Sequence, residues 1–271
     1  MKKVLLVLSV IVVSVLVVAC GSGKSDTSDQ GEVSGPYLPD QRAEAYAYTH
    51  GGYVGKAVVT VGADGSLSVD IDEAFLPHIL ALVDIESPDW SEANTVSYVS
   101  HGTKSYVAKY VQYNDTVYVG VPTGNTFSYV EADENGKPAG DVDLEKAILR
   151  NYDTMRAYYA LIAAGRFGVL TKFGGEVIPV TTTSYGGLTK KSSPGYWNSG
   201  QTWSGNIKAI ETFIEENGGQ YPLTEMVQAT EENSDGLKLW SVADTVTGAT
   251  NTDFKDYFDL VQNALGRLKT N

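Results

Sequence analysis

The sequence predicts an α+β fold in which an antiparallel sheet packs against helices. Segments with strand-like alternation come first, and segments with helical periodicity and further strands follow them. Strands and helices grouped in this way indicate α+β organisation, because a wound parallel sheet would alternate them regularly. The part expected to fold, residues 41–271, is long enough for one large domain or two small ones.

The first predicted element is a β-hairpin. Segments 53–61 and 66–71 alternate apolar and polar residues, and the turn-forming sequence Ala63-Asp64-Gly65 lies between them. Further strands are predicted at 95–99, 105–112 and 116–121, with a tight turn at Asn114-Asp115 and a surface turn at 135–138.

Three helices are predicted from apolar residues at helical spacing. The first spans 143–163, and the second spans 204–217 and ends before Gly218, a residue suited to a helix C-terminus. Between them, residues 186–204 are irregular and rich in Gly, Ser and Trp. The third helix follows Thr252, the expected N-cap. Its apolar residues are Phe254, Tyr257, Phe258, Val261, Leu265 and Leu268.

A run of small and polar residues, Asp244 to Thr250 (DTVTGAT), stands directly before the third helix. Gly248 lets the backbone turn without a Cβ penalty, and Ala249 keeps bulk away from Thr250. A phosphate-linked group on the Thr250 hydroxyl would lie beside the helix N-terminus, where free N–H groups and the helix dipole stabilise an anion. The alternative is that the run is only a strand-to-helix turn.

This run resembles the flavinylation motif of FMN-binding domain proteins, a family that includes the C subunit of sodium-pumping quinone reductases, Rnf-type relatives and secreted flavin lipoproteins. In that family a flavin transferase uses FAD to attach FMN, through its phosphate, to the last threonine of the motif. The resemblance implies covalent FMN on Thr250, with Asp244 as the leading acidic residue and Thr247, Gly248 and Ala249 completing the motif. The chain has no second T-G-A-T run, which implies one flavin.

The start of the predicted hairpin, Gly52-Tyr53-Val54-Gly55, is similar to the opening strand of the same family. It lies about 190 residues before the motif, farther than a compact FMN-binding domain requires. We therefore expect an FMN-binding type of domain with either a large insertion, at about 76–185, or a degenerate duplication.

Aromatic residues are frequent in the loops that precede the motif. The chain contains 17 tyrosines and four tryptophans, and we expect Tyr196 and Trp197 to contact the flavin. Their flat apolar faces suit stacking on an isoalloxazine ring. Ordinary packing is the alternative for any one of them, and similar loops also occur on glycan-binding surfaces.

The N-terminus resembles a bacterial lipoprotein signal. Lys2 and Lys3 precede an apolar run that ends at Ala19 and is followed by Cys20. We expect residues 1–19 to be a removed signal peptide, Cys20 to carry lipid and residues 20–40 to form a flexible tether. A single membrane anchor is the alternative, although the run is shorter than the roughly 20 apolar residues of a spanning helix.

Several functional classes have no support in the sequence. Cys20 is the single cysteine, which leaves no thiol for a disulfide, an iron–sulfur cluster or a haem attachment site. The formal net charge of −13 is poorly suited to nucleic-acid binding. His50, His78 and His101 lack metal-ligand spacing, so no metal site is expected. Neither a nucleophile elbow nor a nucleotide-binding glycine loop is present, and no catalytic residue is predicted.

Together these patterns predict a lipid-anchored electron-transfer flavoprotein on the extracytoplasmic face of the cell membrane, which need not be an enzyme. Its expected partners are a flavin transferase during maturation and membrane quinol or flavin carriers during electron transfer. The alternative is a surface lipoprotein that binds a solute or glycan through its aromatic loops, without flavin.

Overall fold

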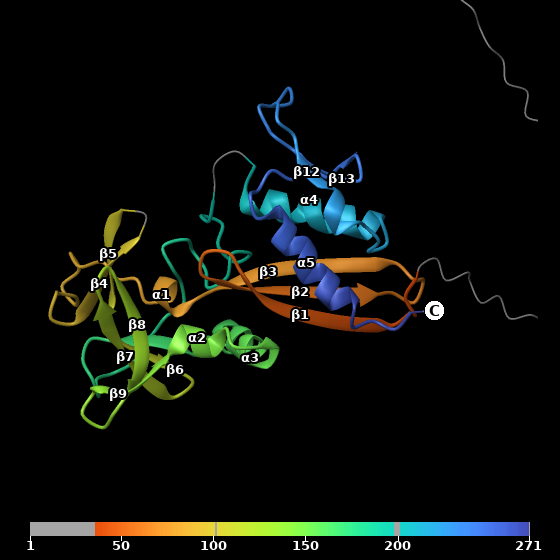
Figure 1. Cartoon of the computed structure of the whole chain (residues 1–271). Helices are drawn as coiled ribbons and strands as arrows, with labels where there is room; N and C mark the ends of the chain where they lie inside the picture. Colours follow the sequence, from red (N-terminus) through yellow and green to blue (C-terminus); the bar gives the residue numbers. More distant parts are fainter. Residues whose placement is uncertain (1–35, 101, 198–200, 271) are drawn as a thin grey trace, which may run out of the picture. The chain divides into compact units, whose positions relative to one another are not determined.

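A three-stranded antiparallel sheet lies at the centre of the part of the fold that contains the candidate site. The computed structural model describes residues 36–100, 102–197 and 201–270 (Figure 1). Strands β1 (Gln41–Thr49), β2 (Tyr53–Val61) and β3 (Leu67–Phe75) lie in the order β1-β2-β3. The β2–β3 hairpin confirms the prediction and continues to Phe75. Strand β1 was not predicted, because its apolar positions are mainly alanines, which are weak strand formers.

The two faces of this sheet pack against different helices. Helices α4 (Trp203–Glu216) and α5 (Phe254–Leu265) cover one face, where sheet residues such as Val59 and Ile71 are fully buried. Helix α3 (Tyr152–Ala163) packs on β1 and β2 from the other side, so the helices lie on opposite sides of the sheet (Figure 1). The sheet therefore separates two hydrophobic clusters.

The segment expected to be an insertion, about 76–185, builds sheets of its own. After α1 (Pro77–Leu80), strands β4 (Thr95–Ser100) and β5 (Thr103–Ala108) pair with each other. A six-stranded sheet has the order β11-β10-β6-β7-β8-β9. Its strands are β6 (Tyr110–Tyr113), β7 (Thr116–Thr123), β8 (Thr126–Ala132), β9 (Pro138–Asp143), β10 (Phe167–Leu170) and β11 (Ile178–Pro179). These elements share a core with Val54 and Phe75 at one end of the central sheet, and all described residues belong to one compact unit.

Two predicted elements in this segment are each divided into two. The strand predicted at 105–112 leaves one sheet and enters another at Lys109, so β5 pairs with β4 whereas β6 pairs with β7 and β10. The helix predicted at 143–163 consists of α2 (Leu144–Ile148) and α3. Asn151 restarts the helix through a capping box with Thr154, which a hydrophobic pattern alone does not reveal.

The C-terminal third contains a second three-stranded sheet that was not predicted. A short 3-10 helix, η1 (Leu223–Glu225), leads into β12 (Met226–Gln228), which pairs with β13 (Trp240–Val242). Strand β13 in turn pairs with β14 (Thr245–Val246). These strands are too short to show an alternating pattern. The mixed architecture, in which all described strand pairs are antiparallel, agrees at a coarse level with the predicted α+β class.

Helix ends and termini differ from expectation in two places. Gly218 closes α4 with φ +59°, as predicted, but α5 begins after Asp253 rather than Thr252. The last residues of the predicted tether lie against the C-terminus, since Tyr37 pairs with Thr270 and the Leu38 N–H bonds to the Lys269 carbonyl at 3.0 Å.

Residues 1–35, which include the predicted signal peptide and Cys20, lie outside the described residues. No helix within 36–100, 102–197 or 201–270 combines the length and apolar character that crossing a membrane requires.

Candidate functional site

The predicted motif runs from a hairpin turn to the start of α5. Ala243 and Asp244 form the two-residue turn between β13 and β14, and both have positive φ, at +47° and +63°. Asp244 is exposed there and does not line the pocket described below. Gly248 has φ +82°, which confirms the expected need for a flexible turn residue, and Ala249 is fully buried in the core.

The two threonines of the motif have different surroundings. Thr247 is buried, and its hydroxyl donates to the Trp240 carbonyl at 2.9 Å and accepts from the Ala249 N–H at 3.2 Å. Thr250 is half-buried, and its side chain lines a pocket. Of the two, Thr250 is the one that borders space that a ligand can fill.

Asn206 of α4 holds the Thr250 turn in place. Its Oδ1 accepts the Thr250 N–H at 2.6 Å, the Thr250 hydroxyl at 3.1 Å and the Asn251 N–H at 3.2 Å. Its Nδ2 donates to the carbonyls of Gln201 and Thr202, both at 3.1 Å. Because Asn206 is 1% exposed and bonded at both ends, the position of Thr250 is set by α4.

A pocket of about 410 Å³ opens beside Thr250. It brings together residues from the β1–β2 turn, the irregular segment before α4, α4 itself and the start of α5. Its lining is His50, Gly51, Tyr53, Lys190, Tyr196, Trp197, Trp203, Asn206, Thr250, Asn251, Thr252, Asp253 and Tyr257. Both predicted aromatic contacts, Tyr196 and Trp197, therefore lie in the same pocket as the predicted acceptor. Trp197 is 65% exposed at its rim.

The two sequence segments that carry the family resemblance meet in this pocket. Tyr53 from the Gly-Tyr-x-Gly start and Thr250 from the motif both line it, although about 190 residues separate them in the chain. The Tyr53 and Tyr196 hydroxyls lie 2.9 Å apart, and burial raises the pKa of both. Both phenols are therefore neutral, and they line the pocket as a hydrogen-bonded pair.

A buried ion pair lies at the floor of the pocket. The Lys190 Nζ is 2.6 Å from Glu73 Oε2, and both side chains are almost completely buried. Glu73 also accepts the Tyr257 hydroxyl at 2.6 Å and the Thr49 hydroxyl, while the Lys190 ammonium lies 3.7 Å from the centre of the Tyr53 ring. Burial lowers the pKa of Lys190, and the charge of Glu73 opposes this change.

Asn251 supplies polar atoms that have no hydrogen-bond partner among the residues that the structure describes. Its side-chain oxygen and nitrogen are both shielded from solvent and make no hydrogen bond in the structure. Buried polar atoms are normally paired, so an orphaned amide in a pocket wall fits a ligand that can both donate and accept. The phosphate and ribityl groups of FMN carry several acceptors and hydroxyls, and the aromatic walls suit its ring system. The residues present therefore fit the implied cofactor.

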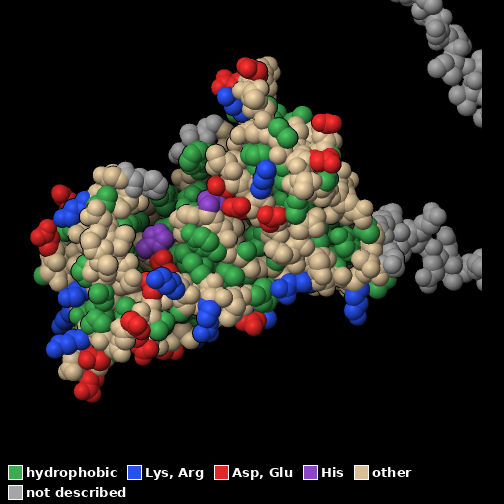
Figure 2. Space-filling view, viewed as in Figure 1, with side chains coloured by type: hydrophobic (Ala, Val, Ile, Leu, Met, Phe, Trp, Pro, Cys, Tyr) green, Lys and Arg blue, Asp and Glu red, His purple; other side chains and the backbone are tan. Residues whose placement is uncertain are grey.

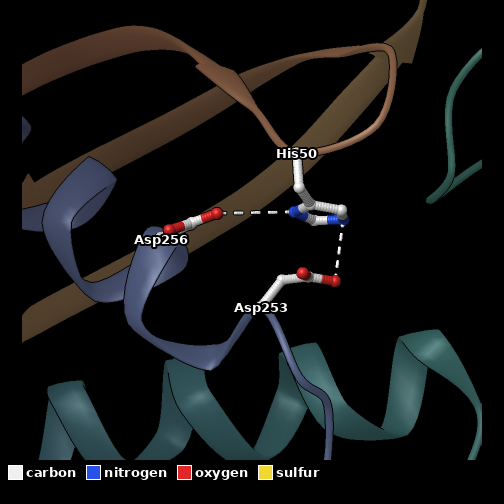
Figure 3. Close-up of side chains that lie close together, drawn as sticks. All are labelled: His50, Asp253 and Asp256. Carbon is white, nitrogen blue, oxygen red and sulfur yellow. Dashed lines mark ion pairs between the residues drawn. The ribbon is translucent and has the colours of Figure 1, made fainter.

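His50 joins two carboxylates from α5 at the edge of the pocket. Its Nε2 is 2.9 Å from Asp253 Oδ2, and its Nδ1 is 3.5 Å from Asp256 Oδ2 (Figure 3). Burial raises the pKa of Asp253, but the hydrogen bond and charge of His50 together with the charge of Lys190 outweigh it, so the pKa is lowered. On the face of the molecule shown in Figure 2, acidic side chains lie near a histidine. The other described histidine, His78, pairs instead with Glu145 at 2.9 Å.

Sequence reasoning missed Glu73, Asn206 and His50 as parts of the site. A solvated loop lysine was the more common interpretation for Lys190, but its side chain is buried beside Glu73. One signal was present for Glu73, because it shares a strand face with the buried residues Val69 and Ile71, where an apolar residue is expected. The others come from distant segments that show no local pattern.

Three comparisons with known proteins found no relative of this chain. The chain matches no family model, no curated protein and no solved structure.

Proposed function

We propose that this chain is an electron carrier with FMN linked through its phosphate to Thr250. The observation that carries the proposal is that Thr250 lines a pocket with Tyr53, Tyr196 and Trp197, so the segments resembling one family converge on one cavity. Its volume of about 410 Å³ lies within the roughly 300–1,000 Å³ of small-molecule sites.

The surroundings of Thr250 support its role as the acceptor. In the attachment reaction the Thr250 oxygen forms a bond to the flavin-side phosphorus of FAD, the diphosphate bond breaks, AMP leaves and the hydroxyl proton is lost. Asn206 Oδ1 accepts the hydroxyl hydrogen at 3.1 Å, which leaves the oxygen lone pairs free for attack. Thr247 is less suited, because the turn already uses its hydroxyl.

Bound FMN would supply one- and two-electron transfer, and the chain's own residues would bind and shield it. The aromatic walls offer stacking faces, while the Asn251 amide offers a donor and an acceptor. Trp197, which is exposed at the pocket rim, offers a contact surface to a redox partner. In this proposal the domain is of the FMN-binding type, and segment 76–185 is an insertion that packs beneath its sheet.

The proposal includes the setting predicted from the N-terminus. A lipid on Cys20 would hold the domain at the extracytoplasmic face of the membrane, near quinol or flavin carriers. Covalent attachment would keep the flavin from being lost to the medium.

A modification experiment tests the acceptor. The chain is coexpressed with a flavin transferase, denatured on a gel and examined for flavin fluorescence and for a mass increase equal to FMN minus water. We expect both signals in the parent and in Thr252→Ala, a matched variant of an exposed threonine two residues away. Both should disappear in Thr250→Ala. Modification that persists in Thr250→Ala, or its absence from the parent, would contradict the proposal.

A second candidate function is favoured by the exposure of Trp197. A pocket with an exposed tryptophan at its rim could hold a planar solute or a sugar without covalent attachment. Unmodified protein that binds such a ligand, with affinity reduced in Trp197→Ala, would support this alternative.

A further inference from the structure

A histidine and two aspartates converge at the edge of the pocket. His50 lies in the turn between β1 and β2, whereas Asp253 and Asp256 lie at the first turn of α5 (Figure 3). One ligand atom from each residue can be chosen so that all three lie within 4.8 Å of one another. Asp253 is the N-cap of α5 and Asp256 lies three residues later in its first turn, so the two carboxylates are on the same side of the helix.

Hydrogen bonding among the described residues does not satisfy this arrangement. A neutral imidazole has one N–H, so it can donate to only one of the two carboxylates that flank it. The other ring nitrogen then directs a lone pair at a carboxylate oxygen, which is repulsive. Nδ1 is shielded from solvent and makes no hydrogen bond, because its 3.5 Å separation from Asp256 is beyond good geometry. The cluster therefore offers lone pairs from one ring nitrogen and two carboxylates to a cation.

A second observation points to a polar occupant of the same pocket. The side-chain amide of Asn251, two residues before Asp253, is shielded and unpartnered at both polar atoms. It lines the same pocket as His50 and Asp253. A hydrated metal ion held by the cluster would bring into this pocket water molecules that can bond to the amide.

We propose that His50, Asp253 and Asp256 bind one divalent first-row metal ion. One imidazole and two carboxylates form a mixed nitrogen and oxygen donor set, which suits Zn²⁺ or Mn²⁺ better than Ca²⁺. Three protein ligands leave a coordination position open, and His50 and Asp253 both border the pocket. The open position is available to water or to an oxygen atom of the pocket's occupant.

The ion would also balance the charge of the pocket. Lys190 is already paired with Glu73, and among the described residues the ion-pair partner of both Asp253 and Asp256 is His50. If the proposed phosphate linkage forms at Thr250, a nearby divalent cation reduces its repulsion by these carboxylates. This last point rests on the proposed function, whereas binding of the ion does not.

Calorimetric titration of the full, metal-free chain with Zn²⁺ tests the proposal. The protein is produced without a flavin transferase, so the result is independent of flavinylation. We expect one bound ion per chain, with affinity lowered at least about tenfold in His50→Ala and in Asp256→Asn. Asp256 is half-exposed, so its variant keeps the fold, and circular dichroism checks both. The matched control is His78→Ala, which removes the histidine paired with Glu145 and should retain binding.

Three outcomes would overturn the proposal. These are the absence of saturable Zn²⁺ binding, equal binding in the parent and His50→Ala, and an equal loss in His78→Ala. Protonated His50 at pH 7 by NMR, together with no Zn²⁺ binding, would show that the cluster is an ordinary ion pair.

Discussion

Asn206 Oδ1 accepts both the backbone N–H and the side-chain hydroxyl of Thr250, at 2.6 and 3.1 Å. One buried amide on α4 therefore fixes a turn that lies 44 residues later in the chain. The motif threonine is not held by its own sequence neighbours alone. Its presentation to the pocket depends on the packing of α4 against α5 and the central sheet.

Replacing Asn206 by Ala should lower both stability and modification. The variant leaves the Thr250 N–H without its buried acceptor, which costs about 1–3 kcal/mol in the free energy of unfolding. Chemical denaturation measures this cost, and gel fluorescence after coexpression with a flavin transferase measures modification. Asn217→Ala is the control, because the Asn217 side-chain amide donates to the Phe213 carbonyl at the end of the same helix, away from Thr250. Full modification of Asn206→Ala would contradict a positioning role for this amide.

The buried pair at the pocket floor should show strong energetic coupling. Lys190→Met leaves the Glu73 carboxylate buried and unpaired, and we expect a loss of about 3–5 kcal/mol. Adding Glu73→Gln removes that charge and retains an acceptor for Tyr257, so the double variant should recover most of the loss. Denaturant unfolding at pH 7 measures both.

Lys191 provides the matched control for this pair. It contacts Asp70 on the surface with its side chain 48% exposed, so Lys191→Met should cost less than about 1 kcal/mol. A double variant no more stable than Lys190→Met would show that Glu73 and Lys190 are not coupled as described.

Stability should depend on pH through Glu211. Burial raises the pKa of this carboxyl, although its bond from the Ile71 N–H at 2.9 Å and the charge of Lys191 oppose the change. A raised folded-state pKa stabilises the protein below the unfolded value, near 4.5, and this stabilisation is lost as the pH rises through the folded value. Glu211→Gln removes the titration and keeps the acceptor. The variant should therefore gain stability relative to the parent between pH 4.5 and pH 7.

Thermal unfolding at the two pH values measures this difference. Glu215→Gln is the control, because Glu215 accepts the Val69 N–H in the same way but is more exposed. The prediction would be contradicted if the parent became more stable, relative to Glu211→Gln, as the pH rises from 4.5 to 7.

Trp197 should contact the flavin without supporting the fold. It is 65% exposed, so Trp197→Ala should change the free energy of unfolding by no more than about 0.5 kcal/mol. A stacked tryptophan donates an electron to excited flavin and quenches its emission, so native flavinylated protein should become brighter in this variant. Steady-state fluorescence at equal flavin content measures the effect. Tyr48→Ala, an exposed aromatic outside the pocket, should leave emission unchanged. Equal emission from Trp197→Ala and the parent would show that Trp197 lies away from the flavin.

The elements that could be predicted from the sequence are those with strong local patterns. Strand β3 alternates apolar and polar residues from Leu67 to Asp72, and α5 has a continuous apolar stripe. Strands β12 to β14 are two or three residues long and leave no periodicity. The change of sheet at Lys109 depends on which partner strand is nearest, which no local pattern records.

The same distinction applies to the site. The motif marks Thr250, and aromatic content points to Tyr196 and Trp197, so these three could be named from the sequence. Lys190 reaches Glu73, and His50 reaches Asp253, only when distant segments pack together. Buried ionic groups of this kind depend on tertiary contacts.

The most direct test of the central claim is peptide mapping of chain that has been coexpressed with a flavin transferase. Trypsin cleaves after Lys238 and Lys255, which releases the peptide 239–255 with four threonines at positions 245, 247, 250 and 252. We predict that this peptide carries FMN and that tandem mass spectrometry assigns it to Thr250. FMN on another threonine, or an unmodified peptide from protein matured with an active transferase, would contradict the account.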